Sequence, residues 1–195
     1  MRVPGLLFAL PLLLAAQPAT LEEWLAAIGR ADRAVLSKSV APPPGLAAAL
    51  ASRLPALKGQ PRVVAAQALA RVESAEAASV LLTLVDDPDL NVAASATRGL
   101  RDAAALPSGT SILARLLKVQ DPTLRSHLYL AAGRARTPLE DLRRAIAAES
   151  NPEARDAAVA AAVRLGGAPE RDRLAASLRS AKADQLVRLL DLVKY

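Results

Sequence analysis

Side chains that could do chemistry are few in this sequence, and their types exclude most enzyme classes. His127 is the single histidine, so motifs that need two, such as the HExxH zinc site, are absent. There is no cysteine, which excludes disulfides, thiolate catalysis and thiolate metal sites. The acidic neighbours at 86–87 and 140–141 fall at the ends and starts of expected helices, where capping and the helix dipole explain them. We therefore predict no catalytic, metal or cofactor-binding residues.

Arginines recur at two positions of a repeating pattern. One set is Arg62, Arg125 and Arg155, and the other is Arg71, Arg134 and Arg164. The sets are nine residues apart, about two and a half turns of helix, so they face opposite sides. We interpret the first set as a ladder between neighbouring units, with Asp121 as a natural partner. The second set lies toward helix C-termini, where the dipole favours positive charge. The alternative is a groove that recognises an acidic partner.

Three residues are candidates for binding a partner: Arg125, Tyr129 and Arg155. Tyr129 is a large aromatic residue in a column of smaller ones, and each arginine lies one turn before that column. The alternative for Tyr129 is a structural role, with its ring packed and its hydroxyl in water.

Residues 1–19 are typical of a secretory signal peptide, with Arg2, an apolar run from Leu6 to Ala16, and then small residues. The run is shorter than the roughly 20 residues of a membrane-spanning helix. Cleavage is expected after Ala16 or Ala19, and the alternative is an uncleaved N-terminal membrane anchor. Loss of Arg2 leaves 24 of the 25 basic residues against 19 acidic ones, which lowers the net charge from +6 to +5. We predict a periplasmic or secreted protein without a membrane span after processing.

The composition favours helices. Apolar residues make up 52% of the chain and aromatic residues only 2%, so the core must be built from Ala, Leu and Val. Residues Thr20–Glu23 form a capping box, and apolar residues at helical spacing extend this helix to about Lys38. The prolines at 42–44 end it. A second helix is expected at 46–57, interrupted or ended near Pro55.

From Pro61 onward, a helix–turn–helix unit repeats about every 31 residues. Four helix starts place a capping oxygen before a proline at the first helical position: Asp87-Pro88, Asp121-Pro122, Thr137-Pro138 and Asn151-Pro152. Alternate helices are expected to start near Ser74, Ser108, Thr137 and Ala168. The second helices share columns of mainly small residues: Ala65, Ala94, Leu128 and Ala158, and also Ala68, Thr97, Ala131 and Ala161.

One unit alone could not bury its apolar faces, whereas a stack of units can. We therefore predict an all-α fold, an α-solenoid of stacked antiparallel helix pairs, with a terminal capping helix near 183–193. His127 aligns with Val64, Ala93 and Ala157, where helices should contact each other, and we interpret it as a partly buried structural histidine.

Three segments resemble the HEAT-repeat family, especially the short repeats of bacterial and phycobilisome-lyase-like HEAT proteins. They are DPDLNVAASATRGL from Asp87, DPTLRSHLYLAAG from Asp121 and NPEARDAAVAAAVRLG from Asn151. The family opens its second helix with Asp-Pro and has Arg four residues after the Asp. Asp121 with Arg125 keeps both, whereas the other two segments keep one each. The resemblance covers about 60–180. It implies HEAT-like repeats with a capping helix over 59–195, a divergent leading repeat over 20–58, and a surface that binds other molecules.

These observations predict an exported, non-enzymatic protein–protein interaction scaffold whose partner is another protein or peptide. One alternative is binding of nucleic acid or another polyanion by a basic concave surface, which the modest charge, the diverging arginines and the scarcity of aromatics disfavour. Another is a HEAT-like lyase or an accessory factor of a larger envelope assembly. The sequence does not indicate an oligomeric state.

Overall fold

The computed structural model describes residues 20–37 and 39–193, and all regular structure within them is helical. The leader predicted at 1–19 lies outside the described residues. The α-helices are α1 (Leu21–Gly29), α2 (Leu46–Arg53), α3 (Gln60–Leu69), α4 (Ala75–Leu84), α5 (Leu90–Asp102), α6 (Gly109–Leu116), α7 (Pro122–Arg134), α8 (Leu139–Ala148), α9 (Pro152–Arg164), α10 (Ala168–Ser180) and α11 (Ala183–Val193). Two 3-10 helices, η1 (Arg33–Leu36) and η2 (Leu54–Ala56), lie between α1 and α3.

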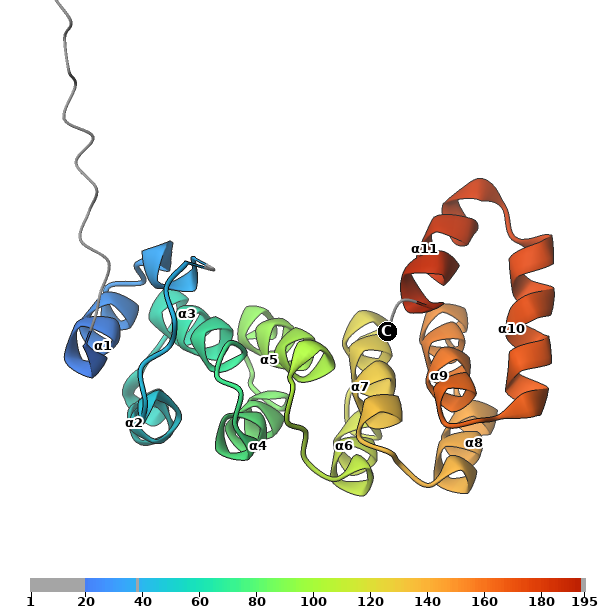
Figure 1. The fold of residues 1–195 in the computed structure, drawn as a ribbon, viewed down its shortest axis with the longest axis horizontal. Helices are drawn as coiled ribbons and strands as arrows, with labels where there is room; N and C mark the ends of the chain where they lie inside the picture. Colours follow the sequence, from blue (N-terminus) through green and yellow to red (C-terminus); the bar gives the residue numbers. More distant parts are fainter. Residues whose placement is uncertain (1–19, 38, 194–195) are drawn as a thin grey trace, which may run out of the picture.

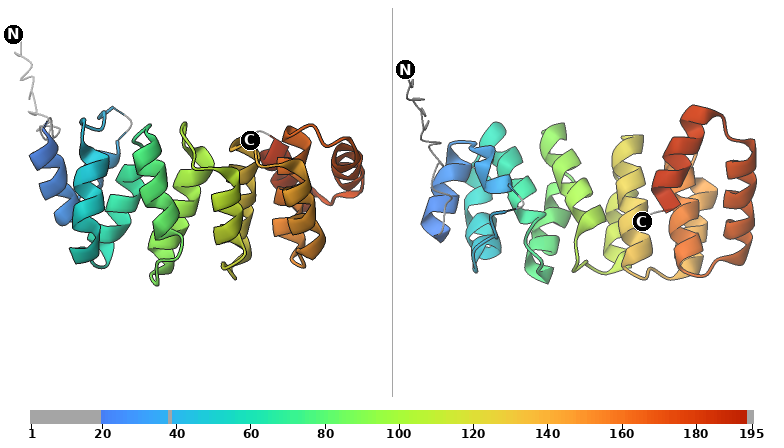
Figure 2. Two further views of the ribbon diagram at one scale, coloured as in Figure 1. Left: turned by 90° about the horizontal axis from the view of Figure 1, so that it is seen from below. Right: turned by 45° about the horizontal axis from the view of Figure 1, so that its top comes forward.

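The helices lie in two rows along the long axis of the molecule (Figure 1, Figure 2). Helices α3, α5, α7 and α9 form one row, here called the odd row, in which each helix contacts the next. Helices α2, α4, α6 and α8 form the even row, in which α2 contacts α4 and α6 contacts α8. Beyond α9, α10 stands at the end of the molecule and α11 turns back to contact α9 (Figure 1). None of the helices in the described ranges is long and apolar enough to cross a bilayer.

Several predicted helix starts are confirmed by their caps. The hydroxyl of Thr20 accepts from the backbone N–H of Glu23, whose carboxylate accepts from the N–H of Thr20 in return. Asp121 caps α7 by accepting from the N–H of Leu124 at 2.9 Å, and Asn151 caps α9 in the same manner. In both of these helices the proline occupies the first position, where no N–H is needed.

Three predicted boundaries are wrong, and at two of them the predicted capping group has a different partner. Helix α5 begins at Leu90 with Asp89 as its cap, since the carboxylate of Asp87 is bound by Arg62 and by the N–H of Asp89. Helix α8 has no side-chain cap, because the hydroxyl of Thr137 donates to the carbonyl of Ala132 at 2.7 Å.

The third difference is at the first helix, which ends at Gly29 rather than near Lys38. The backbone of Ala31 adopts a positive φ of 56°, and the chain then re-enters a short 3-10 turn. The carboxylate of Asp32 caps that turn by accepting from the N–H of Ala34 at 2.9 Å.

The odd row is held together by small residues at close backbone approaches. A Cβ on Gly133 would lie 2.7 Å from the Cβ of Ala161, so α7 and α9 meet where only glycine fits. Gly99 has the same relation to Ala70 between α5 and α3. The predicted small-residue columns contribute to this contact, since Ala65, Ala131 and Ala158 are fully buried. The low aromatic content therefore follows from how closely these helices pack.

Candidate functional site

Two members of the first arginine set, Arg62 and Arg125, reach forward, toward the next helix pair. Nη2 of Arg62 lies 2.6 Å from the carboxylate of Asp87, and Nη2 of Arg125 lies 2.5 Å from that of Glu149. Each acid stands two residues before the cap of the next odd-row helix, and its second oxygen accepts the N–H of that cap residue. The predicted ladder is therefore present at two junctions. The partner of Arg125 is Glu149 and not Asp121, because the carboxylate of Asp121 caps its own helix.

Two members of the second set, Arg71 and Arg134, reach backward. Arg134 donates to the carbonyls of Arg101 and Ala103 at the end of α5, the latter at 2.7 Å. Arg71 donates to the carbonyls of Val35 and Val40, and its guanidinium lies 5.8 Å from the ring centre of Trp24. Arg62 and Arg125 thus reach toward the next helix pair, whereas Arg71 and Arg134 reach toward the preceding one. These four arginines are bound to groups of the chain itself, so they do not form a basic face.

The three predicted partner-binding residues come together around Glu149. Tyr129 is fully buried, and its hydroxyl lies 3.4 Å from the carbonyl of Ala145. Burial, together with the neighbouring Glu149 carboxylate, raises the pKa of Tyr129 to about 12. Nε of Arg155 donates to the backbone carbonyl of Glu149 at 2.9 Å. Arg155 is exposed, so it is the member of this group that can also reach a ligand.

Glu149 itself was not identified from the sequence. It is 1% exposed and accepts from Arg125 and from the N–H of Asn151. Its signal is an acid two residues before a helix cap, a feature that Asp87 shares. Asp87 shows this feature only because Asp89 is the cap of α5, whereas the sequence pattern makes Asp87 itself the expected cap.

His127 is partly buried and lies beside Thr97 of the preceding odd-row helix, with 3.4 Å between Nδ1 and the hydroxyl oxygen. Burial, followed by the positive charges of Arg101 and Arg98, lowers its pKa to about 4. Its imidazole is therefore neutral at pH 7. Within the residues that the structure describes, no group of three or more acidic or histidine side chains could hold a metal ion.

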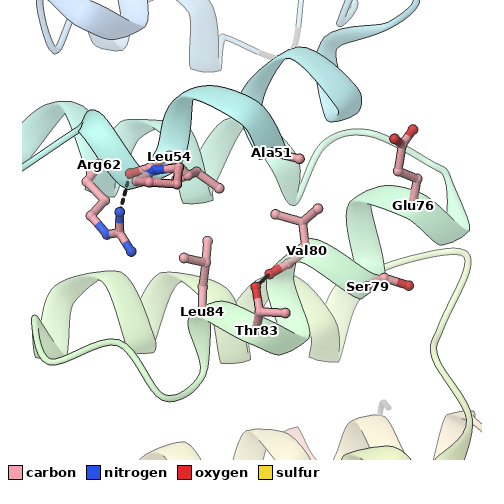
Figure 3. A pocket seen from close by; sticks show the side chains of 9 residues that line it. Ala51, Leu54, Arg62, Glu76, Ser79, Val80, Thr83 and Leu84 are labelled. Atoms are coloured by element: carbon pink, nitrogen blue, oxygen red, sulfur yellow. Dashed lines mark hydrogen bonds between the residues drawn. The ribbon is translucent and has the colours of Figure 1, made fainter.

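The even row carries apolar grooves between neighbouring helices. The α2/α4 groove has a volume of about 460 Å³ and is lined by Ala51, Leu54, Pro55, Arg62, Glu76, Ser79, Val80, Thr83 and Leu84. Figure 3 shows Val80 and Leu84 pointing toward α2, with Arg62 at one end and Glu76 at the other. Arg62 donates there to the carbonyl of Leu54 and to the carboxylate of Asp87, so its charge is paired within the chain.

The α6/α8 groove is the more apolar of the two. It has a volume of about 390 Å³ and is lined by Thr110, Leu113, Ala114, Leu117, Asp141, Arg144, Ala145 and Ala148. Leu117 is 70% exposed, and it adjoins the alanines of both helices. Asp141 and Arg144 form an ion pair at the α8 side, which leaves the groove without net charge. An exposed leucine joined to other apolar side chains makes a surface that a partner can cover.

A third hollow, the α8/α10 pocket, is lined mainly by charged residues. It has a volume of about 360 Å³ and is lined by Arg143, Ile146, Ala147, Arg155, Glu170 and Arg173. Arg143 holds Glu170 through Nε at 2.9 Å and Nη2 at 3.2 Å. These hydrogen bonds keep the pKa of Glu170 below its usual range, so its carboxylate stays ionised.

The groove and the pocket lie on opposite flanks of α8. At 3.6 residues per turn, the groove residues Asp141, Ala145 and Ala148 are about half a turn from the pocket residues Arg143, Ile146 and Ala147. The ridge between the two flanks is exposed and consists of small side chains, Ala147 and Ala148, together with Arg144. Another chain could therefore approach this ridge closely.

Comparisons with known proteins give no relative. No family model matches the chain, and no curated protein or solved structure is significantly similar to it.

Proposed function

We propose that the chain is an exported, non-enzymatic α-solenoid of HEAT-like repeats that binds a segment of another protein on the even-row surface around α8. The observation that carries the proposal is the uncharged α6/α8 groove with the 70% exposed Leu117 at its edge. A groove of this kind accommodates apolar side chains of a peptide or helix, whose burial contributes the binding free energy.

The solenoid assignment is supported by the repeating pattern in the sequence and by the contacts along the odd row. The arginines that reach forward and backward join each helix pair to its neighbours, as nearest-neighbour packing in repeat proteins requires. Export is supported by the leader pattern of residues 1–19.

Binding of a polyanion receives less support from the structure. A basic concave surface would need several free arginines in one line, whereas Arg62, Arg71, Arg125 and Arg134 donate to groups of the chain itself. Catalysis has no support either, because the buried acids Asp87 and Glu149 and the neutral His127 are engaged in contacts between helix pairs.

The binding function is tested by crosslinking the intact chain in an envelope extract and identifying what it captures. Leu117→Gln should abolish capture of a specific partner, because it places an amide on the apolar groove. Leu90→Gln is the matched control, since Leu90 is 68% exposed but lies outside the groove. Equal capture by wild type and Leu117→Gln would remove the α6/α8 groove as the binding site.

Export is tested separately by fractionating cells and determining the mass of the chain. Processing after Ala16 or Ala19 would give a chain that begins at Gln17 or Thr20. A full-length chain found only in the cytoplasm would contradict export without bearing on the groove.

A further inference from the structure

The charges of the α8/α10 pocket are unbalanced. Three guanidinium groups, those of Arg143, Arg155 and Arg173, line it together with the single carboxylate of Glu170. The carboxylate is already bound by two nitrogens of Arg143, whose third nitrogen, Nη1, is bound to Glu140 at 2.6 Å. Arg143 and Glu170 therefore form a closed pair, and the excess positive charge belongs to the other two arginines.

Both of these arginines have N–H groups without an acceptor among the described residues. Nε and Nη2 of Arg155 both donate to the carbonyl of Glu149, and Nη1 has no acceptor among the described residues. Arg173 is exposed and forms no ion pair or hydrogen bond with any residue that the structure describes. Nη1 of Arg155 carries two N–H groups and the guanidinium of Arg173 carries five, which is enough to bind both oxygens of a carboxylate. Because the proposed occupant is a segment of a protein, the matching group is the side chain of an Asp or Glu.

The pocket also has an apolar floor that continues over the helix ridge. Ile146 and Ala147 line it, and Ala147 adjoins Ala148 of the α6/α8 groove on the exposed side of α8. A helix is about 10 Å across, which three residues of extended chain span. A segment lying across α8 can therefore place apolar side chains in the groove and a side chain three or four residues away in the pocket.

We propose that the partner segment joins an apolar anchor to an acidic residue three or four positions away, whose carboxylate binds Arg155 and Arg173 in the α8/α10 pocket. The inference rests on the proposed function, and it adds the chemistry of the partner to it. The apolar anchor fills the α6/α8 groove, and the acid sets the orientation of the segment, because only one flank of α8 offers free guanidinium groups.

The probe is a display library of random dodecapeptides, selected on the intact chain and then measured as labelled peptides by fluorescence anisotropy. Selected peptides should contain a large apolar residue and an Asp or Glu three or four positions away. Arg173→Glu should weaken their binding about tenfold or more, because it replaces attraction by repulsion. Arg171→Glu is the matched control, since Arg171 is an exposed residue of α10 outside the pocket and carries the same change in charge.

A second variant on the peptide side makes the test specific. Replacing the peptide acid by its amide removes the attraction without adding repulsion, so it should cost less than Arg173→Glu, and the two changes together should cost no more than Arg173→Glu alone. Peptides that need Leu117 but bind Arg173→Glu unchanged would overturn the acidic site and leave the proposed function standing. Peptides that depend on neither residue would overturn both. A dimer that is seen by light scattering and lost in Leu117→Gln would mean that a second copy of the chain occupies the α6/α8 groove. That result would overturn the inference.

Discussion

The odd and even rows share a helical architecture but differ in how their helices meet. In the odd row, glycine and alanine bring backbones together, and arginines bind acids and carbonyls of neighbouring helix pairs. In the even row, α6 and α8 leave an apolar groove between them, and the one ion pair that borders it joins two residues of α8. The comparison indicates that the odd row carries most of the contacts that join one helix pair to the next, whereas the even row has the apolar groove of the proposed function.

The largest effect is expected at the buried ion pair of the odd row. Arg125→Met leaves the carboxylate of Glu149, 1% exposed, without its counter-ion, and should lower the free energy of unfolding by about 4 kcal/mol. Urea unfolding measures the change. The double variant with Glu149→Gln should recover part of the loss, since no buried charge is left unpaired. A loss below about 1 kcal/mol for the single variant would mean that the pair behaves like a surface one.

Close approach in the odd row is tested by one substitution at two glycines. Gly133→Ala should destabilise the chain by about 3 kcal/mol, because the new Cβ would meet both Cβ and Cα of Ala161 within 3 Å. Gly29→Ala has nothing within 4 Å of its new Cβ and should stabilise α1 by about 0.5 kcal/mol. Thermal unfolding compares the two variants. Effects of the same sign would refute the assignment of tight packing to α7 and α9.

The pH dependence of stability should also originate in the odd row. The pKa of His127 is about 4 in the folded chain and about 6.5 when unfolded, so between these values the unfolded chain binds the extra proton. Stability is therefore greatest above about pH 6.5 and decreases as the pH falls toward 4, by roughly 2 kcal/mol between pH 7 and pH 5. His127→Gln should flatten unfolding curves measured across that interval. An unchanged slope would assign the pH dependence to other groups.

The smallest effect is expected in the even row. Arg144 is 79% exposed in its pair with Asp141, so Arg144→Gln should change the free energy of unfolding by less than about 0.5 kcal/mol. Urea unfolding beside the Arg125→Met variant gives the contrast directly. A cost near that of Arg125→Met would mean that the two rows do not divide their roles.

The elements were predictable where the signal is local. Thr20, Asp121 and Asn151 cap helices through atoms two or three residues away, which the sequence displays directly. Asp87 looks the same in sequence but is bound by Arg62, 25 residues earlier, and this contact moves the helix start to Leu90. A local pattern cannot reveal which of two partners a carboxylate takes when one of them depends on tertiary structure.

The candidate site was harder to predict for the same reason. Arg155 was predicted to bind a partner and is exposed. Tyr129 was predicted to do so because of its large aromatic side chain, but it is fully buried. The groove residues Ala145 and Ala148 resemble the buried alanines of the odd row, and only the placement of α6 beside α8 distinguishes them. Arg173, which has the freest charge in the pocket, lies in a helix that lacks the repeating start motif.

The arginines that link neighbouring helix pairs also bear on how the chain folds. Arg62 and Arg125 bind acids 25 and 24 residues ahead, and Arg134 binds carbonyls 33 and 31 residues behind. Each such loop is about one helix pair long, so the entropy of closing it is small and folding should be rapid. A chain that emerges with its N-terminus first, as in synthesis or in the proposed export, can therefore complete each helix pair as it appears, without waiting for the last helix.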